Sequence, residues 1–426
     1  MQLPRTRCDC KRWLGLYLLL NVVVVAGCAT VIPQQEESTD FRGRAQTQQD
    51  AGIRVSASVL SPLETKLTFD LSLAQKGIQP VWIEIENKEP TTFTFQLLSV
   101  DPNYFAPSEV AYAMRHRGPS SFEEKIDRML ESHIPILVPA QSTVSGFVFT
   151  SLDPGAKAFS VELLGSNQVR TFEFVQLVPG FELDFMRVDI EGLYQPDEVD
   201  DLDLAGLRAY LESLQCCVLG GDEKTPGDPL NLVVVGEGRH VLATLVRRGW
   251  DLTETMRRDT TWRTVMSSVF GGVYRTSPVS PLYLFGRSHD AALQKARGTV
   301  DERNHLRLWR APVTLDGEPV WVGQISRDIG IKLTRKTLVT HKIDPVVDEA
   351  RAYITLDLAA SQSLRAIGHV KGVGESTREA PRYNYTDDPY YTDGLRVVLI
   401  LAPGRVPPEN IEVLPWETLE SRIARP

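Results

Sequence analysis

Short segments in which apolar and polar residues alternate fill the chain between residues 53 and 184. In "VWIEIEN", Val81, Ile83 and Ile85 alternate with Trp82 and two glutamates, which is the two-residue period of a strand with one buried face. Segments of this kind predict strands at "IRVSASVL", "KLTFDLSL", "VWIEIEN", "TFTFQLLSV", "STVSGFVFT", "AFSVELLG" and "VRTFEFVQLV". Strands at this spacing predict an N-terminal immunoglobulin-like β-sandwich over residues 53–184.

One stretch inside this segment has a different pattern and predicts a helical insert in the sandwich. It reads "APSEVAYAMRHRGPSSFEEKIDRMLESHIP". Ser108 and Ser121 are each followed by acidic residues, as helix N-caps often are, so we expect a pair of short helices. His116 and His133 fall in this insert, and we expect both to be surface or packing residues.

The hydrophobic period changes after residue 196 and predicts a second domain over residues 196–402. Leu204, Leu207, Leu211 and Leu214 recur at three- and four-residue steps, which predicts an amphipathic helix. "PLNLVVVGEG" is a continuous apolar strand, and "RHVLATLVRRGW" after it is a helix that we expect to stop at Gly249.

Further strands and one more helix complete this domain. "HLRLWRAPV" and "PVWVGQIS" flank a turn at Asp316 and Gly317 and predict a hairpin. "KTLVTHKI" and "GLRVVLILA" predict strands, and between them Asp344 and Pro345 are expected to cap the helix "VVDEARAYITLDLAASQSL". The whole chain is therefore predicted to be a multidomain α+β protein whose second domain is mixed α/β. Residues 403–426 are predicted to form a C-terminal tail.

The most apolar run, from Trp13 to Val25, is shorter than the roughly 20 residues that a membrane-spanning helix needs. A cationic cluster precedes it, the layout of a secretory signal. "VAGC", ending at Cys28, resembles the lipobox of bacterial lipoproteins, which implies cleavage before Cys28 and acylation of its thiol, with palmitate among the acyl groups. Residues 1–27 are thus predicted to be a signal peptide; an uncleaved membrane anchor is the alternative. Ala29 favours the outer membrane.

Residue composition and net charge indicate which classes of binding partner are expected. Residues 28–52 are rich in Gln, Glu, Ser and Thr and predict a flexible tether. The formal net charge is −9 at pH 7, and loss of the signal makes it more negative. A broad basic surface for nucleic acid is therefore not expected. The expected partners are a membrane, reached through the lipid anchor, and an envelope protein, lipid or glycan.

Seven blocks in the second domain occur in one order with compatible gaps: "CC", "GDPLNLVVVGEG", "SPVSPLYLFGRSHDAALQKARG", "RNHLRLWRAPV", "PVWVGQISRDIGI", "THKIDPVVDEAR" and "YYTDGLRVVLIL". Together they resemble the LssY C-terminal-like domain family of bacterial proteins, over about residues 196–402. Its members occur alone or fused to membrane segments, which implies a cell-envelope setting. The resemblance brings no established catalytic mechanism.

The strand before the predicted hairpin turn carries the candidate chemistry. His305, Arg307 and Trp309 share one face, and Leu306 and Leu308 the other. A guanidinium beside an imidazole and an indole could hold a carboxylate or phosphate by bidentate hydrogen bonds, and Arg287 is expected to add positive charge to this anion pocket. The alternative is that His305 and Arg307 bond to Asp328 or to backbone and only hold the hairpin together.

Metal, nucleotide and nucleophile signals are weak. His305, Asp328, His341 and Asp344 could together offer imidazole and carboxylate ligands, but His341 shares a face with apolar residues and Asp344 is explained as a helix cap. No HExxH, GK[ST] or GxSxG sequence occurs, and "VVVGEGRHVL" lacks the third glycine of a dinucleotide loop. We therefore expect neither a metal nor a cofactor.

Two further features remain open at the level of sequence. Cys216 and Cys217 are adjacent, so a mutual disulfide is not expected and both are predicted to be buried thiols, with a redox or intermolecular role as the alternative. The tyrosine-rich loop "GVGESTREAPRYNYTDDPYYTDG" is long enough to be functional. We expect a lipid-anchored binding or structural module facing the periplasm. The alternative is an envelope hydrolase of a phosphoester or glycan with His305 and Arg307 in its site, so the residues do not decide whether it is an enzyme.

The predicted anchor is tested by replacing its only acyl acceptor. Cys28→Ala should leave the protein unacylated, because acylation at the lipobox needs the thiol of that residue. Metabolic labelling with a radioactive fatty acid measures this. Label that still enters the alanine variant would place the anchor elsewhere.

Overall fold

A computed structural model describes residues 40–153, 155–179, 189–190, 192–253, 281–296, 303–334, 338–402 and 404–419 of the 426-residue chain. The predicted signal peptide and Cys28 lie outside the described residues. So do the side chains of residues 331–334 and 338–341, and with them the side chain of His341. Within the described part of the chain, no helix is long and apolar enough to cross a membrane.

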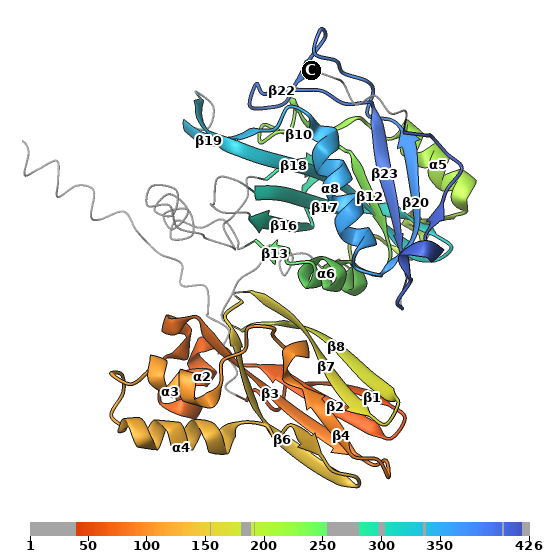
Figure 1. Cartoon of the computed structure of the whole chain (residues 1–426). Helices are drawn as coiled ribbons and strands as arrows, with labels where there is room; N and C mark the ends of the chain where they lie inside the picture. Colours follow the sequence, from red (N-terminus) through yellow and green to blue (C-terminus); the bar gives the residue numbers. More distant parts are fainter. Residues whose placement is uncertain are drawn as a thin grey trace, which may run out of the picture. The chain divides into compact units, whose positions relative to one another are not determined.

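Two antiparallel four-stranded sheets form the N-terminal part of the fold (Figure 1). The first has the order β1 (Gln46–Asp50), β2 (Ile53–Val59), β3 (Ile78–Asn87) and β6 (Ser142–Ser151). The second has the order β5 (Leu137–Val138), β4 (Phe93–Gln96), β7 (Ala156–Gly165) and β8 (Gln168–Leu177). Both sheets contribute to one apolar core, to which β3 supplies Val81, Ile83 and Ile85 as its alternation predicts.

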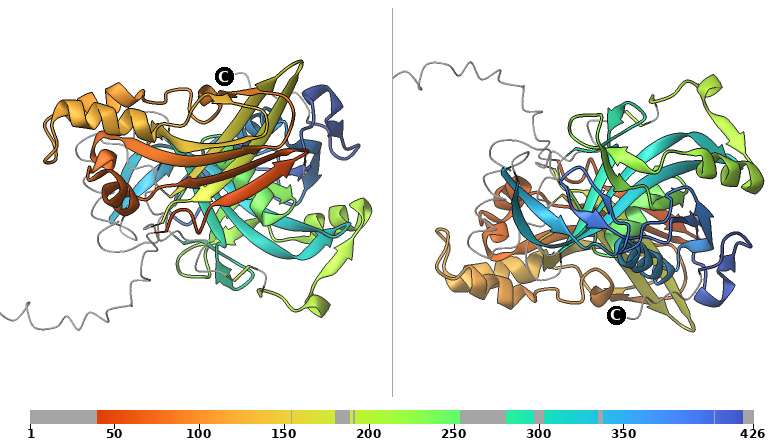
Figure 2. Two further views of the ribbon diagram at one scale, coloured as in Figure 1. Left: turned by 90° about the horizontal axis from the view of Figure 1, so that it is seen from below. Right: turned by 90° about the horizontal axis from the view of Figure 1, so that it is seen from above.

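Helices cover the other face of the first sheet, where Trp82 packs with Phe69, Met114 and Met129. They are α2 (Pro62–Phe69), α3 (Pro107–Ala113) and α4 (Phe122–Ser132); Figure 2 shows α3 and α4, coloured orange, side by side. Single 3-10 turns, η1 (Leu73–Lys76) and η2 (Leu97–Ser99), lie in the connections.

Three local predictions for this part are corrected. "KLTFDLSL", predicted as a strand, begins in helix α2, because Ser61 and Glu64 form a capping box that outweighs the β-branched residues. Ser121 caps α4 as predicted, but α3 is capped at Ala106 and not at Ser108. Part of the predicted tether is a strand, because β1 pairs with β2 through backbone hydrogen bonds, which a polar sequence does not reveal.

A large mixed sheet forms the C-terminal part, in the order β13-β16-β17-β18-β12-β23-β20-β24, with β19 on β18 and β9 beside β17. Its strands are β9 (Asp200–Leu202), β12 (Leu232–Val235), β13 (Asp251–Leu252), β16 (Ala291–Ala296), β17 (Arg303–Leu315), β18 (Glu318–Thr334), β19 (Leu338–Ile343), β20 (Leu364–Lys371), β23 (Leu395–Leu401) and β24 (Glu412–Val413). The predicted hairpin is confirmed, since β17 and β18 pair as Leu315 with Glu318 around Asp316 and Gly317.

The two faces of this sheet have different covers. Helices α6 (Gly238–Arg247) and α8 (Val347–Ala359) pack on one face through Leu245 and Ile354. The other face holds α5 (Leu204–Ser213) and a small sheet of order β11 (Pro226–Pro229), β10 (Cys217–Leu219), β14 (Tyr283–Leu284) and β15 (Arg287–Ser288). Strands β21 (Arg382–Tyr383) and β22 (Pro389–Tyr390) form a separate pair, and η4 (Pro196–Glu198) and η5 (Pro408–Asn410) are single turns.

The start of helix α8 and the predicted C-terminal tail also differ from expectation. Helix α8 is capped at Val346, and Asp344 instead accepts a hydrogen bond from the Val346 amide at 3.0 Å. In the predicted tail, β24 joins the sheet beside β20 and Leu414 enters the core. Residues 180–188 and 191 are outside the described residues, so the predicted division between domains at residues 184–196 stays a prediction.

One carboxylate joins α8 to the edge of the large sheet. Asp357 accepts hydrogen bonds from Arg248 at 2.9 and 3.0 Å, from the Trp250 indole at 2.8 Å and from Lys295 at 3.1 and 3.2 Å. Asp357 is nearly buried, whereas its two cationic partners are partly exposed. Its acceptor positions are therefore filled from two segments, the connection between α6 and β13 and the strand β16.

We expect Asp357→Asn to lower the free energy of unfolding of the full-length protein by about 2 kcal/mol, because an amide cannot accept all of these charged donors. Urea unfolding measures the difference. As the control, Glu212→Gln removes an exposed i,i+4 pair with Arg208 and should cost less than about 0.5 kcal/mol. Equal unfolding midpoints for both variants would contradict the structural role of Asp357.

Candidate functional site

Strand β17 carries a row of polar side chains on the face opposite α6 and α8. The two-residue period places Arg303, His305 and Arg307 on this face, while Leu306 and Leu308 enter the core beneath the helices. Neighbouring strands add polar partners in register: His305 lies between Gln294 and Ser326, and Arg307 pairs with Gln324. We call the following set the polar layer: Asp228, Gln294, Arg303, His305, Arg307, Gln324, Ser326 and Asp328.

The polar layer is buried, although the rest of its face is apolar. Arg303 and Asp328 are 2% exposed, and His305 and Arg307 are 6% exposed. Farther along the same two strands, this face is lined by apolar residues such as Trp309 and Val322. Burying charged groups in a sheet interior costs several kcal/mol for each ion unless they are paired. Such a cluster therefore needs either internal pairing or a function.

The side chains of the polar layer contact one another. His305 Nε2 lies 3.2 Å from Asp328 Oδ2, and Arg303 Nε lies 3.7 Å from the same oxygen. Arg303 also donates to the Gln294 amide oxygen, and Arg307 donates to the Gln324 amide oxygen at 2.9 Å. The contact predicted between His305 and Asp328 in the hairpin-holding alternative is thus present, whereas Arg307 bonds to Gln324.

Asp228 brings a second carboxylate to the layer from β11. It accepts from the Gln324 amide at 3.2 Å and from Asn384 at 2.8 Å. Asn384 lies in the tyrosine-rich loop, which we define as residues 372–394. The polar layer is therefore linked to this loop through one carboxylate.

Both carboxylates hold protons more tightly than usual. Burial raises the pKa of Asp328 to about 7, against the opposing effect of the nearby Arg303 and Arg307 guanidinium groups. Burial also raises the pKa of Asp228, although the hydrogen bond from Asn384 and the charge of Arg307 oppose it. Asp328 therefore exchanges a proton near neutral pH, which suits acid or base chemistry.

Two residues predicted for the pocket have other surroundings. Trp309 is fully buried in the apolar core of this face, and its indole lies 3.4 Å from the Arg287 carbonyl oxygen. Arg287 forms a bidentate pair with Asp290 at 2.9 Å and donates to the Tyr194 hydroxyl. The partners described here for Trp309 and Arg287 lie outside the polar layer, so the structure brings together His305, Arg307 and Asp328 but not Arg287.

Sequence patterns did not identify Asp228, Gln294, Gln324 or Ser326 as members of the polar layer. The signal for two of them was present, because a polar residue at an inward position of an apolar strand is unusual. Gln324 interrupts "PVWVGQIS" and Asp228 precedes "PLNLVVV". Only the register between β16 and β17 places Gln294 beside His305, and the sequence does not show this register.

Among the described residues, no group of three or more His, Cys, Asp or Glu side chains could hold a metal ion. His305 and Asp328 meet, but Asp344 accepts from backbone and lies 4.0 Å from Arg327. His341 has no described side chain. The four metal candidates are thus not brought together by the part that the structure describes.

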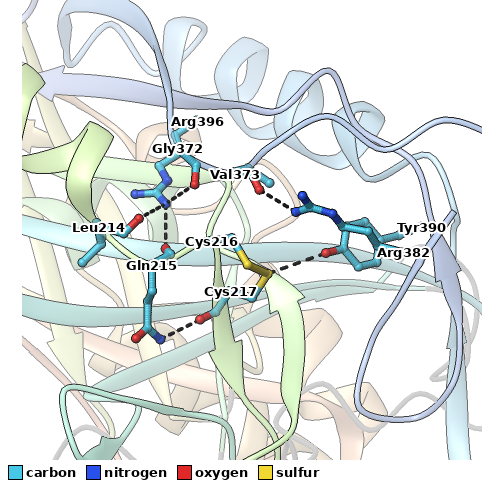
Figure 3. Close-up of a disulfide and its surroundings, with 9 residues drawn as sticks. All are labelled: Leu214, Gln215, Cys216, Cys217, Gly372, Val373, Arg382, Tyr390 and Arg396. Carbon is cyan, nitrogen blue, oxygen red and sulfur yellow. Dashed lines mark hydrogen bonds between the residues drawn. A yellow bond between two sulfur atoms is a disulfide. The ribbon is translucent and has the colours of Figure 1, made fainter. Parts of the chain in front are cut away.

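The two adjacent cysteines correct a prediction. Cys216 and Cys217 form a disulfide with each other across a trans peptide, with Cα atoms 3.7 Å apart (Figure 3). Disulfides usually join Cα atoms 4.4 to 6.8 Å apart, which is why a mutual bridge was not expected. Neighbouring residues can still close a small ring, so Cys216 and Cys217 are not free thiols here.

The raised pKa of Asp328 predicts a pH effect with a definite sign. Between about pH 4 and pH 7 the folded state keeps a proton that the unfolded state releases, so stability should fall as the pH rises through this range. Asp328→Asn mimics the protonated group and should not share this fall, and the two unfolding free energies should diverge by up to about 1.4 kcal/mol for each pH unit. Parallel stability curves of the two proteins, from urea unfolding at pH 4 to 8, would contradict the shift.

Comparison with known proteins supports the predicted resemblance. Residues 209–395 match the protein family described as LssY C-terminus, within the predicted range of 196–402. No match was found among curated proteins. The matched segment includes the polar layer, the disulfide and the tyrosine-rich loop. Residues 209–395 of this chain therefore form a domain of the LssY C-terminus family.

Proposed function

We propose that this protein is a lipid-anchored cell-envelope protein whose C-terminal domain binds an anionic ligand at the polar layer. The observation that carries this proposal is the row of Arg303, His305 and Arg307 on a sheet face that is otherwise apolar. Planar guanidinium groups hold phosphate or carboxylate oxygens by paired hydrogen bonds. The ligand class is therefore a phosphate or carboxylate group, on a lipid, a glycan or an envelope protein.

Protonation of Asp328 would favour such a ligand. Its carboxylate lies beside Arg303 and His305, and its pKa is about 7. When Asp328 takes up a proton, the negative charge next to the Arg303 guanidinium is lost. An incoming anion then meets a more positive layer, so its affinity should increase below pH 7.

A second candidate function is hydrolysis of an envelope phosphoester or glycan. One observation favours it: a carboxyl group that titrates near neutral pH lies 3.2 Å from an imidazole and close to two arginines. Asp328 and His305 could then move a proton while Arg307 holds the oxyanion. Turnover of a nitrophenyl phosphate or glycoside that is lost in Asp328→Asn would favour this candidate over binding alone.

The N-terminal part fits a supporting role in this proposal. We propose that its two packed sheets are an immunoglobulin-like sandwich, which in chain order lies between the lipid anchor and the C-terminal domain. The acylated Cys28 would fix the chain to that membrane, since several acyl chains hold a protein without a spanning helix. The outer membrane, with the domains facing the periplasm, is the favoured location.

The binding proposal is tested by Arg307. In the full-length protein purified in detergent, inorganic phosphate should raise the melting temperature, because it binds the folded state only. Arg307→Ala should weaken phosphate binding by about 1.5 to 3 kcal/mol, or roughly 10- to 150-fold. Arg307→Lys should not restore it, since an ammonium group lacks the planar fork.

A matched control separates binding from stability. Arg351 is also a buried arginine of this domain, and it forms a bidentate pair with Asp393 at 2.6 and 2.7 Å. Arg351→Ala should lower the melting temperature and keep the phosphate response. A strongly destabilised Arg307→Ala with an unchanged phosphate response, or no phosphate response in the unsubstituted protein, would end the binding proposal.

A further inference from the structure

The Cys216–Cys217 disulfide lies where the chain leaves helix α5 and enters β10. Cys217 is 5% exposed, whereas Cys216 is partly exposed to solvent. The Leu230 amide donates to the Cys216 carbonyl oxygen at 2.9 Å, and Cys217 pairs with Pro229 in the small sheet. Of the two cysteines, Cys216 is therefore the residue that is exposed to solvent to a greater extent.

A buried arginine fixes the chain just before the disulfide. Arg396 is fully buried and donates hydrogen bonds of 2.7 to 3.0 Å to the carbonyl oxygens of Leu211, Leu214, Gln215 and Gly372. Figure 3 shows the bonds to Leu214, Gln215 and Gly372. A side chain on Gly372 would meet the Arg396 guanidinium at 3.0 Å, so glycine is needed at this close approach. Arg396 thus holds both the end of α5 and the start of the tyrosine-rich loop.

The disulfide contacts the tyrosine-rich loop directly. Cys217 Sγ lies 3.6 Å from the hydroxyl of Tyr390, which is 2% exposed (Figure 3). The Tyr390 carbonyl accepts from the Ser376 hydroxyl at 2.8 Å, so the contact reaches both arms of the loop. From the same loop, Asn384 donates to Asp228. The disulfide and the polar layer therefore share one connecting segment.

Restriction of the unfolded chain does not account for this disulfide. A disulfide stabilises a protein mainly by restricting the unfolded chain, and the effect grows with the number of residues in the closed loop. Adjacent residues close a ring with no residues between them, so this bond restricts the unfolded chain very little. Its value to the protein must come from what it does in the folded state.

We propose that the Cys216–Cys217 disulfide is a redox-active site, reduced by a protein dithiol, whose state controls the order of the tyrosine-rich loop. A thiolate of the dithiol attacks Cys216 Sγ, on the more exposed of the two residues, and expels Cys217 as a thiolate that takes up a proton. The second thiol of the reductant then attacks the reductant's first sulfur, which is bonded to Cys216 in the mixed disulfide, and so releases Cys216. Two electrons and two protons pass to the cysteines, and the dithiol becomes a disulfide.

Reduction changes the surroundings of Tyr390. The ring that fixes the two sulfur atoms opens, and each thiol gains rotational freedom about its own side chain. The Cys217 thiol can then leave the Tyr390 hydroxyl, and the loop loses one of the contacts that hold it against β10. Arg396 still holds Gly372 and the end of α5, so the domain stays folded while the middle of the loop loosens.

The test measures reduction and loop mobility in the folded, full-length protein. Dithiothreitol at neutral pH, without denaturant, should allow iodoacetamide to add two groups to the peptide containing Cys216 and Cys217, as read by mass spectrometry. Hydrogen exchange in residues 373–394 should then become at least threefold faster, and oxidation should reverse it. Exchange in β17 and β18 serves as the internal control and should not change.

Variants separate the redox site from a general loss of stability. The double variant Cys216→Ser, Cys217→Ser should exchange quickly in the loop with or without reductant. Tyr390→Phe should keep reducible cysteines but show a smaller difference between the two redox states. Labelling that occurs only in denaturant, or full reduction that leaves loop exchange unchanged, would overturn the proposal. None of these readouts depends on anion binding.

Discussion

The two-residue period of the β17–β18 hairpin is the constraint on which the C-terminal domain depends. On one face of these paired strands, Leu306, Leu308 and Ile325 close the core beneath α6 and α8. On the other face, Arg303, His305 and Arg307 must then point together, because a shift of one residue in register would move charges into the apolar core. The register of β17 and β18 therefore sets the positions of both the apolar core and the polar layer, and a shift in register would disrupt both.

Sequence patterns predicted which helices and strands form better than they predicted which backbone and side-chain groups these elements contact. The apolar stripe of α5, the run at β12 and the hairpin turn at Asp316 and Gly317 follow local rules that tertiary structure did not override. Errors occurred where a local hydrogen bond competed with side-chain character, as in the capping box of α2. The polar edge strand β1 was missed because backbone pairing leaves no hydrophobic signal.

For the candidate site, periodicity could predict which side chains share a face but not what they meet. His305, Arg307 and Asp328 were named from one hairpin, within which pairing is nearly local. Gln294 and Asp228 come from strands whose position is set by long-range pairing, and Asn384 comes from a loop. Arg287 was grouped with the site because of its charge alone, yet Asp290, three residues away, binds it. A charged residue that is close to a site in the sequence is therefore only weakly supported as part of that site.

Asp228 connects the two functional proposals through its own charge. Its raised pKa depends on burial and is opposed by the hydrogen bond from Asn384, a residue of the tyrosine-rich loop. If the loop loosens, that hydrogen bond weakens while more water reaches the carboxylate, and the two changes move its pKa in opposite directions. Burial is the largest cause of the shift, so the protonation of Asp228 depends on how closely its surroundings exclude water. Asp228 also accepts from Gln324, which in turn accepts from Arg307, so one chain of hydrogen bonds links the tyrosine-rich loop to the polar layer.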